Sequence, residues 1–174
     1  HNGIDCFLDA AKIVIHDYKK NNIQFLIVGK GSLLNKMKQK AADLNIEKNV
    51  KFKGHISFEN IVEYYRKLSL FVAVSTRESF GVSVLEAEAC GIPVITSDVD
   101  GLPEVNKHKH TGLIIKPNEP KRLANSIIKL FKHNNYRNQL SINARNWVVT
   151  NFDWEKSHNK MINVYKKVYD KKKS

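Results

Sequence analysis

Two glutamates, Glu78 and Glu86, stand eight residues apart on either side of Gly81, and no other residues of this chain are better suited to chemistry. A carboxylate accepts strong hydrogen bonds from hydroxyl groups, each worth about 1.5–3 kcal/mol when the acceptor is charged. A glycine between the two carboxylates lets a phosphate approach the backbone closely. The residue types therefore indicate a ligand that carries both hydroxyl groups and an anion.

The elements on either side predict where these glutamates lie. The run Leu70–Val74 is continuously apolar, as expected of a strand buried on both faces. Residues Val82–Cys90 predict a short helix that ends at Gly91, and Pro93 prevents its continuation. Gly81 thus precedes a helix N-terminus, where free backbone N–H groups and the helix dipole favour an anion.

Glu86 falls on the apolar side of the predicted helix, near Leu85 and Ala89 on a helical wheel. A carboxylate there is costly to bury unless donors satisfy it. Ribose or sugar hydroxyls could be those donors. The alternative is that Glu86 caps a backbone turn or pairs with a nearby lysine, and the spacing does not decide between the two.

The rest of the chain alternates between predicted helices and strands, which is typical of a parallel sheet wrapped by helices. In such a fold, ligands bind at the carboxyl ends of the strands. The predicted strands are Gln24–Val28, Val50–Lys53, Leu70–Val74, Pro93–Thr96 and Leu113–Lys116. We expect Ser32 and Ser57 to cap the two helices that they precede, and three helical segments to follow Pro120.

The last helical segment has a strong apolar stripe, with Asp153 as its expected N-cap. Two interpretations are open: the stripe packs on this domain, or part of it belongs on another domain. The stripe consists of Trp154, His158, Met161, Tyr165 and Val168.

Composition favours one soluble domain. The chain has 174 residues, 42% of them hydrophobic, which suffices for a single core. It contains no apolar run of membrane-spanning length and opens on no signal peptide. Cys6 and Cys90 have neither disulfide-framework nor metal-site spacing, so a reducing cytoplasm is expected.

The formal net charge of +12 has two open interpretations: simple solvation of the surface, or attraction to anionic partners such as a nucleotide diphosphate, a lipid phosphate or an acidic membrane leaflet. The basic residues are scattered, except for clusters at Lys166–Lys167 and Lys171–Lys173. Aromatic residues do not interleave with them, so nucleic acid is not an expected partner.

Three other patterns carry less weight. Gly29-Lys-Gly31 follows a strand but lacks the third glycine of a dinucleotide fingerprint, because Leu34 stands in its place. Asp98-Val-Asp100 matches the D-x-D of metal-dependent transferases of a different fold, and we interpret it as a polar turn. The seven histidines show no metal-binding spacing on a helix, so no metal site is expected.

The stretch Glu78-Ser-Phe-Gly-Val-Ser-Val-Leu-Glu86, extended through Val94, resembles the E-x7-E signature of glycosyltransferase family 4. Further motifs of that family occur in the expected order, so the resemblance covers nearly all of the chain from Gly3 to Tyr169. They are Phe25-Leu-Ile-Val-Gly-Lys-Gly31, Val50-Lys-Phe-Lys-Gly54, Asp100-Gly-Leu-Pro-Glu-Val105 and His110-Thr-Gly-Leu-Ile114.

The resemblance implies a GT-B glycosyltransferase and assigns roles to matching positions. Glu78 would contact hydroxyls of the donor sugar, and Glu86 would bind the ribose of the nucleotide. The segment Ser79–Val82, with the backbone amides of Phe80, Gly81 and Val82, would hold the sugar and the diphosphate. The loop Gly54-His55-Ile56 would edge the nucleobase, and Gly29 belongs to the glycine element at the end of the first matching strand. The family generally works without a metal ion, so no cofactor is implied.

The resemblance also implies that residues 1–174 are a single Rossmann-like donor-binding domain, the C-terminal half of a longer enzyme. In the family, a strand that carries an arginine and a lysine for the diphosphate precedes the matching region. Neither residue has a counterpart, and Asn2 stands near the expected position of the lysine. We therefore expect the first strand of this domain and the N-terminal acceptor domain to be absent, and the isolated domain to be inactive.

The predicted function is the donor-binding half of a retaining glycosyltransferase of polysaccharide biosynthesis. It would act in the cytoplasm, with peripheral contact at the inner face of the membrane, on a nucleoside-diphosphate sugar and a glycan or lipid-linked acceptor. Two alternatives remain open: a non-catalytic module that binds sugar nucleotides, and a related GT-B epimerase or phosphorylase. The sequence does not predict the sugar, the base, the acceptor or the oligomeric state.

Overall fold

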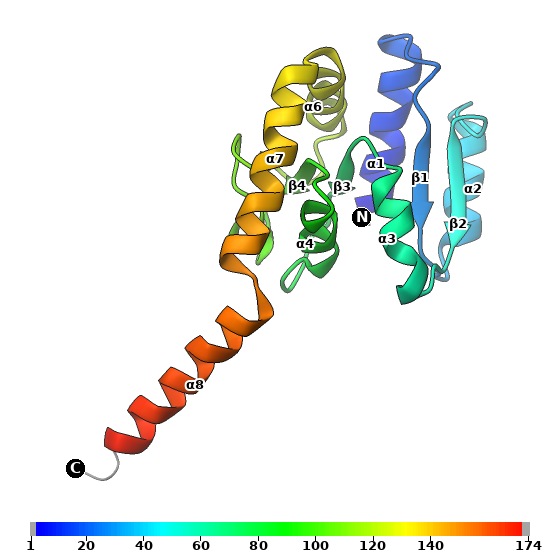
Figure 1. Cartoon of the computed structure of the whole chain (residues 1–174). Coiled ribbons are helices and arrows are strands. Elements are labelled where there is room, and N and C mark those ends of the chain that lie inside the picture. The colour runs from blue at the N-terminus through cyan, green and yellow to red at the C-terminus, as the bar shows by residue number, and fades with distance from the viewer. Residues whose placement is uncertain (1–2, 172–174) are drawn as a thin grey trace.

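The computed structural model describes residues 3–171 as an α/β domain from which one long helix projects (Figure 1). Asn2 and the lysines at 172 and 173, on which two of the expectations above depend, lie outside the described residues. Helices and strands alternate along the first two thirds of the chain, as the sequence predicts. They are α1 (Gly3–Lys12), continued by one π-helical turn at Ile13–Asp17, β1 (Phe25–Val28), α2 (Leu34–Asp43), β2 (Val50–Gly54), α3 (Phe58–Arg66), β3 (Phe71–Ala73), α4 (Val82–Ala89), β4 (Val94–Ser97), α5 (Leu102–Val105) and β5 (Gly112–Ile115).

All strand pairs are parallel, and the strands form two sheets. One sheet pairs β1 with β2, with Phe25 opposite Val50. The other has the order β3-β4-β5, with Phe71 opposite Val94 and Val94 opposite Gly112. The expected Rossmann-like arrangement of parallel strands flanked by helices is confirmed. Its division into two sheets is a feature that the sequence pattern did not reveal.

The second sheet holds the most deeply buried strand. All four residues of β4 are buried, because β4 has a strand on each edge and helices on each face. One apolar core, which includes Leu8, Phe25 and Ile95, connects α1, α6 and both sheets. A smaller core around Val84 and Leu102 fills the space between α3, α4 and α5.

An open slot of about 820 Å³ separates the two sheets. Every residue of β1 and of β3 lines it, and within residues 3–171 the facing edges of these strands have no strand partner. In Figure 1, β1 and β2 stand apart from β3 and β4. The first turn of α1 lies at the carboxyl end of β3, since a Cβ atom on Gly3 would sit only 2.0 Å from the carbonyl oxygen of Val74.

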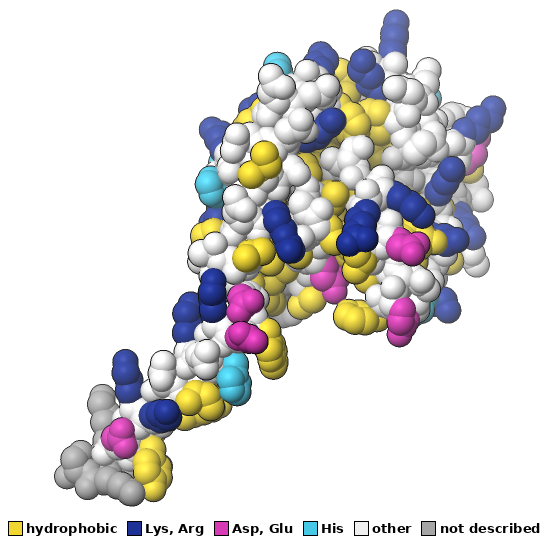
Figure 2. Space-filling model, in the orientation of Figure 1, with side chains coloured by type: hydrophobic (Ala, Val, Ile, Leu, Met, Phe, Trp, Pro, Cys, Tyr) yellow, Lys and Arg dark blue, Asp and Glu magenta, His cyan; other side chains and the backbone are white. Residues whose placement is uncertain are grey.

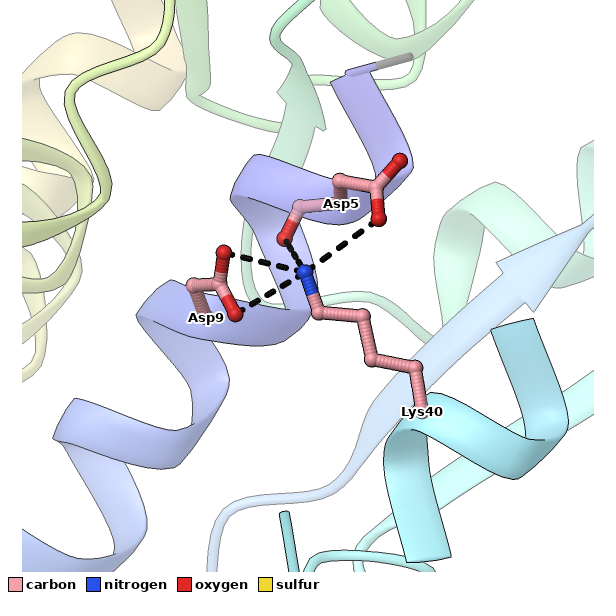
Figure 3. A network of polar contacts seen from close by, with 3 residues as sticks. All are labelled: Asp5, Asp9 and Lys40. Atoms are coloured by element: carbon pink, nitrogen blue, oxygen red, sulfur yellow. Dashed lines mark hydrogen bonds and ion pairs between the residues drawn. The ribbon is translucent and has the colours of Figure 1, made fainter. Parts of the chain in front are cut away.

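A three-residue ion-pair cluster joins α1 to α2. The Lys40 ammonium group lies 3.2 Å from a carboxylate oxygen of Asp5 and 2.9 Å from one of Asp9, and it also donates to the backbone carbonyl of Asp5 (Figure 3). Asp5 and Asp9 are one helical turn apart, so one ammonium group reaches both. This contact holds α2, and with it the β1–β2 sheet, against the rest of the domain.

Three helices complete the chain, as predicted: α6 (Pro120–Lys132), α7 (Asn134–Asn151) and α8 (Trp154–Lys171). Asp153 caps α8 as expected, because its carboxylate accepts the backbone N–H of Lys156 at 3.0 Å. Every described side chain of α8 is exposed, and hydrophobic side chains gather along one side of it (Figure 2). The interpretation that the stripe packs on this domain is therefore wrong for this structure.

The two predicted serine caps differ in outcome. Ser57 occupies the N-cap position of α3, but its hydroxyl group makes no capping bond to the helix backbone and accepts from the Asn60 side chain at 2.9 Å. The N-cap of α2 is Leu33, so the prediction for Ser32 is wrong. The chain turns at residues 32 and 33 before α2 begins, and Leu34 N–H donates to the carbonyl of Gly31. Among the residues described, no helix combines the length and the hydropathy needed to cross a membrane.

Candidate functional site

The segment of residues 75–81, here called the signature loop, connects β3 to α4 and carries Glu78. Gly81 is the N-cap of α4 and has a φ of +92°, which L-residues with a side chain rarely adopt. A Cβ atom at this position would also lie 2.8 Å from Cδ2 of Leu102. The loop therefore requires glycine at this point for two independent reasons.

A second loop, between β4 and α5, braces the signature loop. The backbone N–H of Glu78 donates to the Asp100 carboxylate at 3.0 Å, and the N–H of Gly101 donates to the Glu78 carbonyl at 3.2 Å. A Cβ atom on Gly101 would lie 2.5 Å from the carbonyl oxygen of Ser79, so the two loops touch through backbone. Asp100 thus uses its carboxylate to hold a turn, which agrees with the interpretation of Asp98-Val-Asp100 as a polar turn.

The bracing leaves the amides at the start of α4 free. None of the described residues accepts a hydrogen bond from the backbone N–H groups of Phe80, Gly81 and Val82. Ser79, Phe80 and Val82 are exposed, whereas Gly81 between them is buried, so a ligand can reach this helix N-terminus at Phe80 and Val82. Amides and helix dipole together form a favourable place for an anion.

Both signature glutamates are half-buried beside these amides. Glu78 lines the end of the slot between the sheets, together with Ser83 on the first turn of α4. Glu86 lies further along α4, and its Oε2 accepts a hydrogen bond of 2.9 Å from the hydroxyl group of Tyr65 on α3. The sequence pattern gives no signal that the hydroxyl group of Tyr65 meets Glu86.

The fully buried carboxylate of α4 is Glu88, not Glu86. The helical wheel predicted an apolar stripe that Glu86 shares with Leu85 and Ala89, whereas the structure buries Val84, Ala87 and Glu88. Helix α4 packs against α7 as well as against the sheet, so more than one of its faces is covered. Burial raises the pKa of Glu88 to about 7, although Thr111 and the charge of Lys107 oppose the rise.

Two glycine turns follow the strands of the smaller sheet. Gly29, with a φ of +138°, ends β1, and its N–H donates to the carbonyl of Gly54, with a φ of +77°, at 2.8 Å. The next residue, His55, is exposed, and Ile56 after it is half-buried; both lead into α3. Because Tyr65 lies on α3, this helix connects the glycine turns to Glu86.

The structure thus brings the predicted residues together in two groups. Glu78, Ser79–Val82 and Glu86 gather around the start of α4, and Gly29, Gly54, His55 and Ile56 gather at the ends of β1 and β2. Within residues 3–171, no group of three or more His, Cys, Asp or Glu side chains is arranged to hold a metal ion. The arrangement defines a Rossmann-like α/β domain in which a helix N-terminus with free amides is flanked by two carboxylates.

Comparison with known proteins identifies the family. The model of the family described as Glycosyl transferases group 1 matches residues 1–147, and the chain belongs to this family. The chain is 29% identical over 171 residues to an uncharacterized glycosyltransferase of Methanocaldococcus jannaschii, and the match covers 98% of the chain but 41% of that protein.

Solved glycosyltransferases of the GT-B fold resemble the structure closely. The sucrose-phosphate synthase of Thermosynechococcus elongatus superposes with a TM-score of 0.79 at 28% identity, covering 96% of this chain and 44% of that one. TarM of S. aureus, solved with fondaparinux, alpha-GlcNAc-glycerol and UDP, gives a TM-score of 0.84 at 25% identity, covering 93% of this chain and 32% of that one. The chain therefore spans less than half the length of the relatives that it matches.

Proposed function

We propose that this chain is the donor-binding half of a retaining glycosyltransferase of family 4, which moves a sugar from a nucleoside-diphosphate sugar to a glycan or lipid-linked acceptor. The observation that carries the proposal is the set of three free amides, of Phe80, Gly81 and Val82, between the half-buried carboxylates of Glu78 and Glu86. A nucleoside-diphosphate sugar offers an anion for the amides and hydroxyl groups for both carboxylates. The UDP in the solved structure of TarM supports this ligand class.

The residues of the signature loop and of α4 that surround the free amides each have a role in this proposal. Glu78 accepts hydrogen bonds from hydroxyl groups of the donor sugar and orients the reacting centre. Glu86 accepts hydrogen bonds from the ribose. Ser79 and the amides of Phe80, Gly81 and Val82 contact the sugar and the diphosphate.

The amides act most strongly when the diphosphate departs. Negative charge grows on the leaving group, and donors that are already oriented toward it stabilise the transition state without reorganising. Losing one such donor costs about 2.7–4 kcal/mol in comparable anion holes. The braced geometry of the signature loop supplies this preorganisation, because Asp100 and Gly101 fix Glu78 through its backbone. The proposal assigns no cofactor, since the helix N-terminus itself supplies the positive field.

The glycine turns edge the nucleobase. Gly54, His55 and Ile56 follow the carboxyl end of β2, and Gly29 supports them through its hydrogen bond to Gly54. A Cβ atom on Gly29 or Gly54 would meet nothing within 4 Å, so the surface beside both turns is open. The base can therefore lie against backbone there while Glu86 holds the ribose.

The domain organisation follows from the slot between the sheets. We propose that residues 1–174 belong to one Rossmann-like domain whose first strand precedes Gly3 and lies between β1 and β3. Such a strand would complete a single parallel sheet and enter α1 at the carboxyl end of β3, where Gly3 meets Val74. The order that results, with the inserted strand at the centre, is that of a doubly wound sheet.

The acceptor site belongs to an N-terminal domain in this proposal, and α8 reaches toward that domain. The exposed apolar side of α8 includes Trp154, Met161 and Tyr165, with exposed fractions of 82%, 56% and 63%. An apolar face of this size requires a partner surface. The lysines of α8 and the net charge of +12 favour an acidic leaflet of the inner membrane as a peripheral contact of the whole enzyme in the cytoplasm.

The test is a calorimetric titration of the chain with UDP, GDP and ADP and their sugars, beside Glu86→Ala and the matched control Glu63→Ala. Glu63 is an exposed glutamate on α3. We expect one nucleotide series to bind, Glu86→Ala to weaken it about tenfold or more, and Glu63→Ala to leave it unchanged. Equal binding by all three proteins would contradict the proposal.

If no nucleotide binds the chain, the same titration on the chain extended upstream to its full gene length separates two causes of the missing binding. Binding that occurs only with the extension would show that the inserted strand is needed. Silence of both proteins would contradict the proposal, and it would equally contradict a non-catalytic module that binds sugar nucleotides. Release of nucleotide that depends on an acceptor sugar would support a transferase, whereas dependence on inorganic phosphate would indicate a phosphorylase.

A further inference from the structure

Tyr65 occupies an unusual position between the two groups of the site. It lies near the end of α3 with an exposed fraction of 5%, and its ring packs edge-on against Phe71 of β3 with 5.6 Å between ring centroids. Its hydroxyl group donates to Oε2 of Glu86 at 2.9 Å. A phenylalanine would fill the same apolar space, so packing alone does not account for the hydroxyl group.

The hydrogen bond from Tyr65 restricts the rotation of the Glu86 carboxylate and leaves its other acceptor positions free. A carboxylate has about four lone-pair sites, and Tyr65 occupies one of them, so Glu86 can still accept further hydrogen bonds. Burial and the adjacent Glu86 raise the pKa of Tyr65 well above its ordinary value. The hydroxyl group therefore remains a donor at every working pH, and it fixes the rotation of the carboxylate before a ligand arrives.

The tyrosine ring is itself immobilised. Its contact with Phe71 ties it to β3, and α3 ties it to the turn at Gly54, His55 and Ile56. A side chain held in this way can transmit a fixed position to Glu86 at little entropic cost on binding. Helix α3 thereby fixes the turn at Gly54, His55 and Ile56 relative to the Glu86 carboxylate.

We propose that Tyr65 is a positioning residue that orients Glu86 toward the ribose and so makes the site discriminate ribonucleotides from deoxyribonucleotides. The inference rests on the proposed function of Glu86. A carboxylate held at one oxygen presents the other in a fixed direction, where it meets both hydroxyl groups of a ribose. Without the tyrosine hydroxyl group, the carboxylate rotates and gains less from the 2′- and 3′-hydroxyl groups of the ligand.

The experiment compares ligand pairs that differ only in the ribose. UDP, GDP and ADP are each titrated beside their 2′-deoxy and 3′-deoxy counterparts, with the wild-type chain and with Tyr65→Phe, Glu86→Gln and Tyr64→Phe. Tyr64 is a matched control because it is the next tyrosine on α3, and its ring lies beneath Lys53 and Lys67. Thermal unfolding checks that each variant is folded.

We expect the wild-type chain to prefer the ribonucleotide by about tenfold. In Tyr65→Phe this preference should fall to the level seen in Glu86→Gln. The double variant, which carries both substitutions, should lose little more of the preference than either single variant. Tyr64→Phe should keep the preference. Undiminished preference in Tyr65→Phe, beside its loss in Glu86→Gln, would overturn the inference and leave the proposed function intact. Silence of the wild-type and upstream-extended chains with every ligand would overturn both.

A measurement on the wild-type side chain covers the case in which Tyr65→Phe does not fold. With tyrosines labelled with ¹³C at Cζ, the Tyr65 resonance should move when the ribonucleotide saturates the chain and should move less with its 2′-deoxy counterpart. A Tyr65 resonance that responds equally to both ligands would overturn the inference.

Discussion

The signature loop and the glycine turns both follow the carboxyl ends of parallel strands, but they are held in place very differently. The signature loop is fixed by two hydrogen bonds to the Asp100–Gly101 turn and by close contact of Gly81 with Leu102. The glycine turns are joined by one backbone bond from Gly29 to Gly54 and have open space beside them.

The difference indicates a division of labour. Charge stabilisation requires donors that do not move during the reaction, so the loop that carries the free amides is rigid. A nucleobase is a large, mostly neutral group, and an open turn at the edge of a two-stranded sheet can accommodate it without preorganisation.

The largest contrast is expected between two glycine substitutions. Gly81→Ala forces an alanine into a left-handed conformation and places its Cβ 2.8 Å from Leu102, so we expect a loss of roughly 2–5 kcal/mol in the free energy of unfolding. Gly29→Ala meets no neighbour within 4 Å and should cost about 1–3 kcal/mol through backbone strain alone. Urea denaturation of both variants measures the difference. Equal losses would contradict the claim that the signature loop is the tightly packed one.

The second prediction concerns Glu88, which is buried near the end of α4, close to Thr111 and Lys107. Its pKa is raised from 4.5 to about 7 by burial, so the folded state binds the proton more tightly than the unfolded state does. This contribution is fully present below pH 4.5 and is lost as the pH rises through 7, which amounts to about 3 kcal/mol in total.

Glu88→Gln should therefore flatten the decline of unfolding free energy between pH 5 and pH 8, by roughly 2–3 kcal/mol relative to the wild-type chain. Denaturant titrations at the two pH values provide the measurement, with the exposed Glu63→Gln as control. Amide protection factors, which remove the intrinsic rise of exchange with pH, should fall with pH around α4 and stay unchanged in β1 and β2. A decline of the same slope in Glu88→Gln and wild type would refute the assignment.

The smallest effect is expected on the side of the glycine turns. Lys40→Met removes the ammonium group that joins Asp5 and Asp9 to α2, and these groups are a quarter or more exposed. Ion pairs with such exposure contribute about 0–1 kcal/mol, and the methionine keeps the apolar part of the side chain. We expect a loss of at most about 1 kcal/mol, measured by denaturation at low and at high salt. A larger loss of unfolding free energy in Lys40→Met than in Gly81→Ala would mean that the side of the glycine turns, not the signature loop, is the rigid one.

Much of the fold could be predicted from the sequence. The apolar runs that begin at Gln24, Val50, Leu70, Pro93 and Leu113 all became strands within one or two residues of the predicted bounds. The carboxyl ends of these strands also correctly located the glycines and glutamates. Such elements are fixed by local pattern, and local pattern is what a sequence shows directly.

The contacts between elements could not be predicted in the same way. The Tyr65 hydroxyl group and the Glu86 carboxylate meet because α3 and α4 lie side by side, and Glu88 is buried close to Lys107 and Thr111, which lie beyond β4 in the chain. The gap between β1 and β3 likewise reflects the sheet as a whole. A helical wheel treats each helix alone, so it placed Glu86 where Glu88 belongs.

The most direct test of the central claim is a ¹H–¹⁵N NMR titration of the chain with the nucleoside diphosphate that binds it best. If the free amides bind the diphosphate, the chemical shifts of the Phe80, Gly81 and Val82 amides should change most, followed by those around Glu86 and Gly54. Shifts of these amides no larger than those of the exposed helix α8 would contradict it.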